Sequence, residues 1–318
     1  MTEKLFLGVD GGQSRTTAMI GDGRGRVLGM GLAGPCNHAS AGEGRAKLEN
    51  AVRDSVRQAC EAAGLDFAVV RFGGACLGFS GGPDDKEEIV KALLRAERVK
   101  VTDDAWIALI GATGGEAGLI VISGTGSIAL GRNAAGRKAR AGGWGYVFGD
   151  EGSAFDITRK ALRASLRYEE GWGPATSLRG RLLDASGATT ANELLHRFYT
   201  PEFTRPQMAR LAKLVDEAAD AGDAVAASIL VKAAGALTAL AEAVRKQLFR
   251  ARETALVCPI GGVFRSTMVR ENFSHIAGGV AGTTVAEAKH GPAAGALIEA
   301  YSLAGVHVPL EGAPDEKP

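Results

Sequence analysis

The chain has 318 residues, with 37 Lys and Arg against 36 Asp and Glu, which leaves a formal net charge of +1. This balance predicts no nucleic-acid partner, because nucleic-acid-binding domains concentrate positive charge. With 46% hydrophobic and 23% charged residues, the composition excludes disordered and collagen-like chains. At roughly 150 residues per domain the length predicts two domains. The 45 glycines predict many tight turns or close approaches of backbone to a ligand.

The cysteines and the longest apolar stretch predict a cytoplasmic protein without a membrane span. The four cysteines are too widely separated for a CxxC redox pair or a zinc ribbon. We therefore expect reduced, buried thiols and a cytoplasmic location. These cysteines are Cys36, Cys60, Cys76 and Cys258. The longest apolar stretch, Ala224 to Val244, is interrupted by Lys232 and Glu242, so we expect no membrane span.

The first third of the chain predicts a β-β-β-α-β-α-β unit. Apolar runs bounded by turn residues predict strands, and apolar residues three or four apart predict helices. Gly21-Asp22-Gly23 is a hairpin turn signal between the second and third strands. The expected elements are strands at 5–10, 15–20 and 26–32, a helix at 43–63, a strand at 69–79, a helix at 84–97 and a strand at 99–102.

The same opening recurs in the second part of the chain. A strand at 117–123 runs into a Gly/Ser turn, and one offset pairs Gly11 with Gly124 and Ser14 with Ser127. The ordered recurrence predicts two homologous α/β lobes, at 1–112 and 113–318. Helices at 151–168, 191–198, 206–221 and 223–250 enlarge the second lobe, followed by a strand at 255–260, a helix and a last helix at 292–303. The alternative for this last helix is that it packs back on the N-terminal lobe.

Two glycine turns follow the first strands of the two predicted lobes. They are Asp10-Gly11-Gly12-Gln13-Ser14 and Ser123-Gly124-Thr125-Gly126-Ser127. Glycines let backbone N–H groups approach phosphate oxygens, and the hydroxyls add donors. Either turn alone is more often an ordinary β-turn, but two in matching places favour a pair of phosphate cradles. Neither is a Walker A loop or a GxGxxG fingerprint.

A pair of acids, Asp103-Asp104, follows the last strand of the first unit. Ligand sites of α/β proteins form at such strand ends. A carboxylate there can take the proton of a substrate hydroxyl that attacks phosphorus. The alternative role is a helix N-cap, and either acid fits either role.

Residues 142–153 form a glycine-rich window with aromatic and acidic side chains. Its N–H donors and the carboxylate of Asp150 suit a polyhydroxy ligand, although Asp150 could instead cap the next helix. A second strand-turn-helix, Cys258 to Ser266, carries Gly261-Gly262, against which a flat ring could lie. This turn is more often an ordinary βα turn.

Taken in order, the two glycine turns and the Ile260–Phe264 turn resemble the phosphate and adenosine motifs of the sugar kinase, heat-shock protein and actin superfamily. The resemblance covers nearly the whole chain. It implies an α/β fold of two ribonuclease H-like lobes around an ATP/sugar cleft. Within the superfamily, the chain is similar to the N-acetylglucosamine kinases in Asn37-His38, Ser80-Gly81-Gly82, Thr102–Ala105 and 142–154. A sister group comprises the ATPases that activate benzoyl-CoA reductases and 2-hydroxyacyl-CoA dehydratases.

The resemblance implies a role for each matching residue. Asp104 would be the base facing the 6-hydroxyl of the sugar, and Asp10 would hold Mg²⁺ through water. The other sugar-binding positions would be Asn37, His38, Ser80, Gly143, Trp144, Gly145 and Asp150. ATP would lie along Gly11, Gly12, Gln13, Ser14, Gly124, Thr125, Gly126, Gly261, Gly262 and Ser266. The superfamily resemblance also favours a homodimer.

The resulting hypothesis is an ATP-dependent kinase that converts N-acetylglucosamine to its 6-phosphate. Glucosamine and N-acetylmuramic acid are alternative substrates, because one or two side chains can admit or refuse the groups by which they differ. An activator ATPase is the alternative from another class, but it needs cysteines placed to bind an iron–sulfur cluster. A sugar sensor or an actin-like filament protein has less support, because filament assembly leaves the 144–153 loop unexplained.

Overall fold

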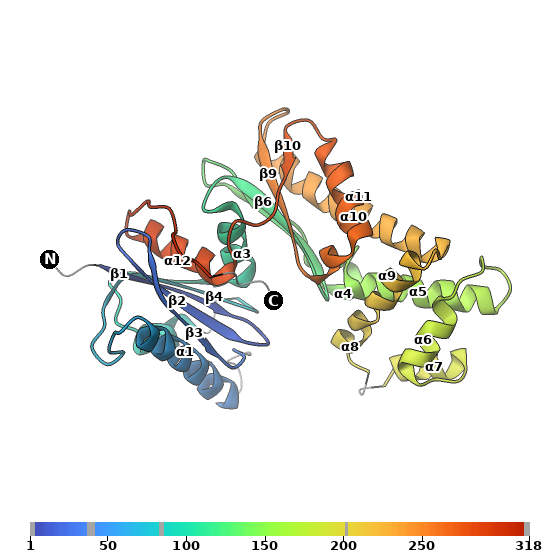
Figure 1. Ribbon diagram of the computed structural model, residues 1–318, viewed down its shortest axis with the longest axis horizontal. Helices are drawn as coiled ribbons and strands as arrows, with labels where there is room; N and C mark the ends of the chain where they lie inside the picture. Colours follow the sequence, from blue (N-terminus) through green and yellow to red (C-terminus); the bar gives the residue numbers. More distant parts are fainter. Residues whose placement is uncertain (1–3, 37–41, 83–85, 201–202, 315–318) are drawn as a thin grey trace. The chain divides into compact units, whose positions relative to one another are not determined.

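The chain divides into two compact units (Figure 1). Unit 1 comprises Met1–Glu116 with Glu287–Pro318, and unit 2 comprises Ala117–Ala286. The computed structural model describes residues 4–36, 42–82, 86–200 and 203–314. The units differ from the boundaries expected from the sequence in two places: the first lobe extends beyond residue 112, and the C-terminal segment belongs to unit 1 rather than to the second lobe.

Unit 1 is built on a five-stranded sheet of order β3-β2-β1-β4-β5. The strands are β1 (Leu5–Gly11), β2 (Thr16–Asp22), β3 (Val27–Ala33), β4 (Phe72–Phe79) and β5 (Val99–Asp103). The first three pair antiparallel as a meander, whereas β4 and β5 run parallel to β1. The hairpin between β2 and β3 is closed by Asp22, whose carboxylate accepts hydrogen bonds from the backbone N–H groups of Arg24 and Arg26, each at 3.0 Å.

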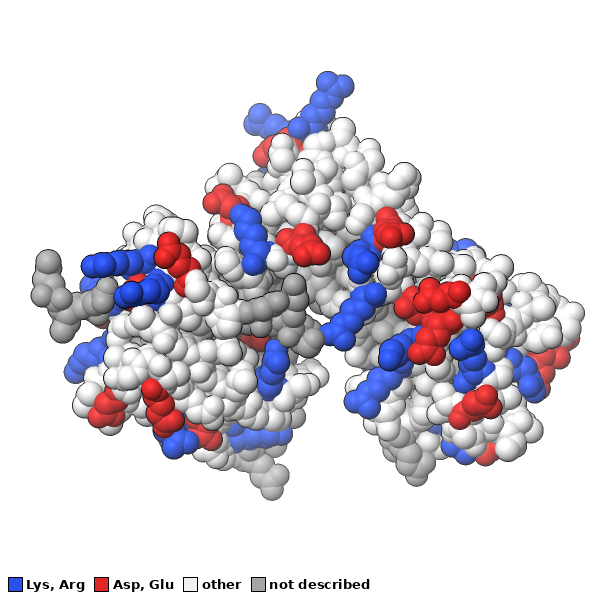
Figure 2. Space-filling model, in the orientation of Figure 1, with Lys and Arg blue, Asp and Glu red and all other residues white. Residues whose placement is uncertain are grey.

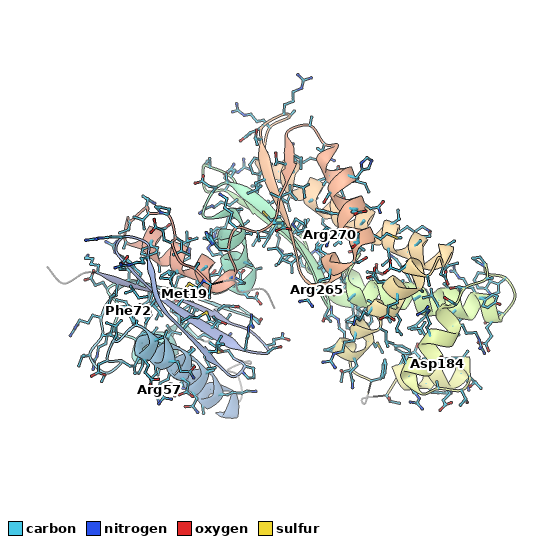
Figure 3. The ribbon with its side chains drawn as sticks, viewed as in Figure 1. Met19, Arg57, Phe72, Asp184, Arg265 and Arg270 are labelled. Atoms are coloured by element: carbon cyan, nitrogen blue, oxygen red, sulfur yellow. The ribbon has the colours of Figure 1, made fainter. Side chains whose placement is uncertain are left out.

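Helices cover both faces of this sheet. They are α1 (Gly42–Ala62), α2 (Glu87–Leu93), α3 (Asp104–Thr113) and α12 (Pro292–Leu303). Side chains alternate along β1, so Leu7 and Val9 join the core beneath α1 while Phe6 joins the core beneath α12. Figure 3 shows Met19, on the α12 side, and Arg57, which is exposed on α1.

Close packing of α12 on β1 depends on Gly8. A Cβ at this position would lie 2.2 Å from the backbone nitrogen of Leu297, so only glycine lets the helix approach. At one end of α12, the Tyr301 hydroxyl donates to the carbonyl of Asp22 at 2.8 Å. The C-terminal helix is thus part of the core of unit 1.

Unit 2 repeats the topology with a five-stranded sheet of order β10-β9-β6-β7-β8. The strands are β6 (Gly118–Ser123), β7 (Ser127–Arg132), β8 (Lys138–Gly142), β9 (Ala255–Ile260) and β10 (Thr283–Val285). Again three strands form an antiparallel meander, and β9 and β10 run parallel to β6 and to each other. The predicted pair of α/β lobes is therefore confirmed.

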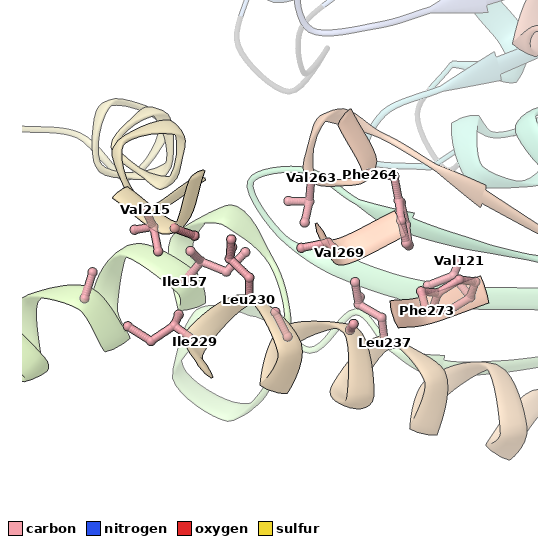
Figure 4. Close-up of a cluster of buried hydrophobic side chains, with 14 of the residues drawn as sticks. Val121, Ile157, Val215, Ile229, Leu230, Leu237, Val263, Phe264, Val269 and Phe273 are labelled. Carbon is pink, nitrogen blue, oxygen red and sulfur yellow. The ribbon is translucent and has the colours of Figure 1, made fainter. Parts of the chain in front are cut away.

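A helical insertion enlarges unit 2 between β8 and β9. Its helices are α4 (Gly145–Phe148), α5 (Ala154–Glu169), α6 (Leu178–Ser186), α7 (Ala191–Phe198), α8 (Arg205–Arg210), α9 (Ala212–Asp220) and α10 (Ala224–Leu248). The 3₁₀ helix η1 (Gly262–Arg265) and α11 (Thr267–Gly278) follow β9. One apolar core joins the sheet, α5, α9, α10 and α11, and Figure 4 shows part of it around Leu237 and Phe273.

Several expected elements differ in extent. The helix expected at 84–97 spans only Glu87–Leu93. It ends there because Leu94 is extended and Ala96 forms a β-bridge with Phe72, the first residue of β4. The helix expected at 206–221 is two helices, α8 and α9, joined at Leu211. The short α4, α6, β8 and β10 were not predicted as separate elements; each is short and has a weak local pattern.

Among the described residues, α10 is long and apolar enough to cross a membrane by length and composition alone. A core helix passes the same test, and one face of α10 packs into the core of unit 2, whereas Val231 is exposed. Lys and Arg are intermixed with Asp and Glu over the face drawn in Figure 2, in keeping with the balanced charge of the chain.

Candidate nucleotide and sugar site

In unit 1, strand register gathers predicted site residues at one edge of the sheet. Gly11 at the end of β1 lies opposite Phe79 of β4, which lies opposite Asp103 of β5. These strands are parallel, so their carboxyl ends meet at the same edge, where ligands of α/β sheets bind. The first glycine turn, Ser80 and Asp104 all follow directly from this edge.

The two adjacent acids at the end of β5 have different roles. Asp103 is the N-cap of α3, and its carboxylate accepts from the backbone N–H of Trp106 at 2.7 Å. Asp104 is the first helical residue; one carboxylate oxygen accepts from its neighbour Ala105 N–H at 2.8 Å and the other from the Ser80 hydroxyl at 2.5 Å. The capping role therefore belongs to Asp103, and Ser80 orients the half-buried Asp104 carboxylate.

Backbone hydrogen bonds hold the first glycine turn, and its side chains reach solvent. Gly12 N–H donates to the carbonyl of Arg15 at 2.9 Å, and the carbonyl of Gly12 accepts from Cys36 N–H at 3.0 Å. Gln13 and Ser14 are exposed at the tip of the turn, and Asp10 is half-buried at its base. Asn37 and His38 come directly after Cys36, but both lie outside the described residues.

In unit 2, the second glycine turn lies beside the predicted adenosine turn. The parallel strands β6 and β9 place Ile122 opposite Ile260, so the two turns leave the sheet at the same edge. Gly261 has φ +106°, and a Cβ there would lie 2.4 Å from the carbonyl oxygen of Ser123. By contrast, a Cβ at Gly124 or Gly262 would have no atom within 4 Å, so both glycines border open space. Figure 3 labels Arg265 and Arg270, which follow this turn.

The second glycine turn is braced by the loop before α5. The Ser123 hydroxyl donates to the carbonyl of Gly152 at 3.0 Å, and the Ser127 hydroxyl donates to the carbonyl of Glu151 at 2.7 Å. In the other direction, Ala154 N–H donates to the carbonyl of Gly124 at 2.9 Å. The turn and the glycine-rich window thus form one hydrogen-bonded structure.

Asp150 is the central carboxylate of this structure. It has φ +62°, which is unusual for a residue other than glycine, and it is only 3% exposed. One carboxylate oxygen accepts from Ser127 N–H at 3.1 Å, and the other forms a salt bridge with Arg205. Asp150 does not cap α5, because Ser153 is the N-cap. Strained residues of this kind are concentrated at functional sites.

The remaining predicted sugar-binding positions form the exposed start of the same loop. Gly143 N–H donates to the carbonyl of Ser127 at 3.0 Å, and Gly143 and Gly145 have φ values of +73° and +77°. Trp144 is 65% exposed, with the guanidinium of Arg140 4.6 Å from its ring centre. The ring therefore presents an apolar surface next to the turn.

Ser266 is placed differently from the other predicted nucleotide-binding residues. It is 8% exposed and is the N-cap of α11, accepting from Val269 N–H at 3.3 Å. Its hydroxyl also donates to Asp216 of α9. Since the hydroxyl already has both partners, Ser266 fixes the start of α11 beside the Gly261-Gly262 turn.

A buried acid supports the loop from within α5. Burial raises the pKa of Asp156, but hydrogen bonds from Lys160, the backbone N–H of Gly152 and Arg159 hold it below its ordinary value. These bonds measure 2.7, 3.0 and 2.8 Å. Asp156 thereby fastens Gly152, which in turn holds Ser123.

A pocket of about 710 Å³ lies among the inserted helices of unit 2. It is lined by α5, α7, α8 and the α4 segment, and most of its lining residues are apolar or aromatic. Arg205 and Tyr146 belong to its wall. Arg205 therefore connects the wall of the pocket to the carboxylate of Asp150 through their salt bridge.

Two residues of this region were not predicted from the sequence. Arg205 pairs with Asp150 across 55 positions of sequence, and Asp216 accepts from Ser266 across 50. The local signal at Arg205 was only that of a helix start, Thr204 with Gln207 three residues later. No local pattern connects it to Asp150.

Comparison with known proteins agrees with this geometry. The model of the BadF/BadG/BcrA/BcrD ATPase family matches residues 7–300, and the chain belongs to this family. Its members use ATP, so the two glycine turns belong to an ATP-dependent protein. This match confirms the expected ATPase group, and the relatives that follow confirm the expected relation to the N-acetylglucosamine kinases.

Curated relatives are amino sugar kinases. An N-acetylmuramic acid/N-acetylglucosamine kinase of Clostridium acetobutylicum is 33% identical over 270 residues, which cover 83% of this chain and 86% of that protein. An N-acetyl-D-glucosamine kinase of Dictyostelium discoideum is 34% identical over 259 residues, covering 78% and 81%.

Solved structures agree over nearly the whole length. A protein of Chromobacterium violaceum, described as a candidate N-acetylglucosamine kinase, has a TM-score of 0.72 at 28% identity, covering 93% of this chain and 98% of that one. A glucokinase of the ROK family from Streptomyces griseus has a TM-score of 0.55 at 19% identity, covering 94% and 99%. The latter likeness shows a shared fold.

Proposed function

We propose that this protein is an ATP-dependent kinase that phosphorylates an amino sugar at the 6-hydroxyl, with N-acetylglucosamine as substrate and N-acetylglucosamine 6-phosphate as product. The observation that carries the proposal is the carboxylate of Asp104. It stands at the ligand-binding edge of the unit 1 sheet, is released from capping by Asp103 and is oriented by Ser80. The amino sugar kinases among the relatives support the substrate class.

Asp104 acts as the general base. The 6-hydroxyl oxygen of the sugar attacks the γ-phosphorus of ATP, its proton passes to Asp104, and the bond from the γ-phosphorus to the β–γ bridging oxygen breaks to release ADP. The Ser80 hydroxyl bond holds one carboxylate oxygen in place, and the other, which accepts from Ala105 N–H, has a second lone pair for the substrate proton. Phosphoryl transfer needs this positioning more than it needs covalent chemistry.

The nucleotide binds along the glycine turns. Gly11, Gly12, Gly124 and Gly126 are the proposed residues along the phosphates, with the hydroxyls of Ser14 and Thr125 and the amide of Gln13 as donors. The N–H groups of Gly12 and Gly124 already donate to the carbonyls of Arg15 and Gly126, so these two glycines contribute close approach of the backbone. The open space beside Gly124 and Gly262 supports close approach of phosphate and adenosine to bare backbone. Ser266 contributes by fixing the helix that follows the adenosine turn.

Asp10 is the proposed Mg²⁺ residue. Its carboxylate stands half-buried at the end of β1, directly before the phosphate turn. Mg²⁺ in phosphoryl-transfer sites is held by one or two carboxylates together with substrate phosphates, so one acid at this position fits. The ion would neutralise charge on the phosphates. The described residues contain no group of three or more His, Cys, Asp or Glu side chains that could hold a metal without a substrate.

The sugar binds at the braced loop of unit 2. Asp150 and the N–H of Gly145 are the proposed hydroxyl partners, and Trp144 offers an apolar ring to the acetamido methyl group. Gly143, whose N–H donates to Ser127, is proposed to shape the loop beside the sugar. Asn37 and His38 complete the proposed set as predictions from the sequence. Glucosamine and N-acetylmuramic acid are the alternative substrates, since a kinase of both N-acetylmuramic acid and N-acetylglucosamine is among the relatives.

The activator ATPase remains the alternative from another class, because the family includes such proteins. An iron–sulfur cluster needs accessible thiolates. All four cysteines lie in the described part of the chain, where they are buried and form no disulfide, and burial raises the pKa of Cys36, of Cys76 and, to about 11, of Cys60. Buried thiols favour the kinase.

A coupled assay of ADP release tests the proposal. Mg·ATP is offered with N-acetylglucosamine, N-acetylmuramic acid, glucosamine, N-acetylmannosamine and glucose in turn. We expect turnover on acetamido sugars, with the product carrying phosphate on O6 by NMR. Folded, ATP-binding protein that releases no ADP with any of these sugars would contradict the kinase assignment.

Asp104→Asn is the sharpest variant within that assay. We expect kcat to fall about 1,000-fold, because general base catalysis contributes 10²–10⁴-fold. The matched control is Asp103→Asn, which keeps the helix cap but loses its charge, should destabilise by about 0.5 kcal/mol and should keep its kcat. Equal losses of kcat in the two variants would show that Asp104 is not the base.

We also propose that the protein is a homodimer and lies in the cytoplasm, as expected from the sequence. Light scattering coupled to size-exclusion chromatography tests the dimer, and cell fractionation tests the location.

A further inference from the structure

Arg205 connects three parts of the candidate sugar and nucleotide region of unit 2. Its guanidinium pairs with the carboxylate of Asp150, and the same nitrogen lies 3.5 Å from the carbonyl oxygen of Thr125 in the second glycine turn. The side chain comes from α8, in the helical insertion. One cation therefore bridges the proposed phosphate turn and the proposed sugar carboxylate.

Aromatic rings and a helix cap hold Arg205 in place. Its guanidinium lies 5.2 Å from the ring centre of Tyr146 and 5.8 Å from that of Phe155. Thr204 N–H donates to the Gln207 side chain at 2.6 Å, which fixes the start of α8. The Thr158 hydroxyl of α5 donates to the carbonyl of Met208 at 3.0 Å and ties α8 down. The arginine is thus positioned before any substrate binds.

Asp150 depends on this cation for its position. The carboxylate is almost fully buried and its backbone is in the left-handed region, so the residue keeps this conformation only while its surroundings hold it. Ser127 N–H is a neutral partner, and Arg205 supplies the charged one. A buried carboxylate that loses its charged partner is strongly disfavoured.

We propose that Arg205 is a positioning residue for the kinase reaction: it holds the sugar-binding carboxylate of Asp150 and fixes it to the second phosphate turn through the carbonyl of Thr125. The inference rests on the proposed function, and it assigns a role to a residue outside the glycine-rich motifs. The inserted helices thereby take part in sugar recognition, because they carry the residue that orients Asp150.

Three variants test this role in the full-length protein. Arg205→Met keeps the length and the ring contacts but removes the charge, and Arg205→Lys keeps the charge but not the planar fork. Arg210→Met, at the exposed other end of α8, is the matched control. We expect Arg205→Met to raise KM for N-acetylglucosamine about 30-fold and to leave KM for ATP within about 3-fold, since a bond to a charged group contributes that much. Arg205→Lys should recover part of the loss.

The double variant Arg205→Met with Asp150→Asn distinguishes positioning from direct contact. If Arg205 acts through Asp150, the double variant binds sugar no more weakly than Asp150→Asn alone. Additive losses, or a rise in KM for ATP as large as that for the sugar, would overturn the inference.

Hydrogen–deuterium exchange of the free protein tests the same idea without turnover. Arg205→Met should speed exchange of the amides at 124–127 and 150–154 by about tenfold, because local stability sets protection. Arg210→Met should leave it unchanged. Unchanged exchange in Arg205→Met contradicts the inference, whereas a wild-type protein without sugar-dependent ADP release contradicts the proposed function, so the two failures are distinguishable.

Discussion

The two glycine turns occupy equivalent places in two equivalent sheets, yet they are supported differently. The first, Gly11–Arg15, is held by backbone bonds to its own residues, to Ser80 and to Cys36. The second, Ser123–Ser127, shares four hydrogen bonds with the loop at 150–154, and in two of these a hydroxyl of the turn donates to a loop carbonyl.

This difference predicts which substrate site is affected when each turn moves. Movement of the first turn affects the nucleotide alone, within the proposed function. Movement of the second also moves Asp150, and with it the proposed sugar site. The two sheets share one topology, and among the described residues the inserted helix α8 supplies an arginine that contacts the second turn.

Gly126→Ala should disturb the contact between the second glycine turn and Asp150 most strongly. A Cβ there would lie 2.8 Å from a carboxylate oxygen of Asp150 and 3.0 Å from a nitrogen of Arg205, so the ion pair must move. We expect KM for the sugar to rise about 50-fold, the scale of a lost charged interaction. Kinetics at saturating ATP measure this. A variant in which only KM for ATP changed would show that the second turn does not govern Asp150.

Gly124→Ala should affect the nucleotide alone. The added methyl group has open space in the free protein, so the melting temperature should not change. It would occupy the space proposed for phosphate, and we expect KM for ATP to rise about tenfold through lost backbone contacts. Isothermal titration with the ATP analogue AMPPNP checks the affinity. If Gly124→Ala raised KM for the sugar more than KM for ATP, the assignment of Gly124 to the nucleotide alone would be contradicted.

Asp156→Asn should loosen the loop without touching substrate. It removes the charge that binds Lys160, Arg159 and the N–H of Gly152, and we expect the free energy of unfolding to fall by about 2 kcal/mol. Urea unfolding at neutral pH measures the loss. The exposed Asp184, changed to Asn, is the control and should lie within about 0.5 kcal/mol of wild type.

Lowering the pH should also remove the stability that the charge of Asp156 contributes. The pKa of Asp156 in the folded protein is below its ordinary value of 3.8, so its stabilisation is present above that pH and is lost as the pH falls through the lowered pKa. Wild type and Asp156→Asn should therefore converge in stability as the pH falls from about 6 to about 2. A constant difference over this range would show that the charge of Asp156 is not responsible.

The sequence predicted the duplicated α/β fold and the turns that follow its strands, because apolar periodicity and glycine spacing are local signals. It could not separate Asp103 from Asp104, since both fit a cap and only the hydrogen bond to Ser80 distinguishes them. Nor could it find Arg205, whose partner Asp150 is far away in sequence. Ser266 was predicted to contact ATP, and its hydroxyl instead caps α11 through Val269 and donates to Asp216, a partner 50 positions away that no local pattern shows.

The C-terminal helix α12 has a consequence for how the protein is made. Unit 2 is one continuous segment, Ala117–Ala286, whereas unit 1 is assembled from both ends of the chain. On the ribosome the sheet of unit 1 emerges first, but its face around Gly8 and Phe6 stays uncovered until residues 292–303 are synthesised. Unit 2 can complete its own core before then. Unit 2 should therefore complete its core before unit 1 does.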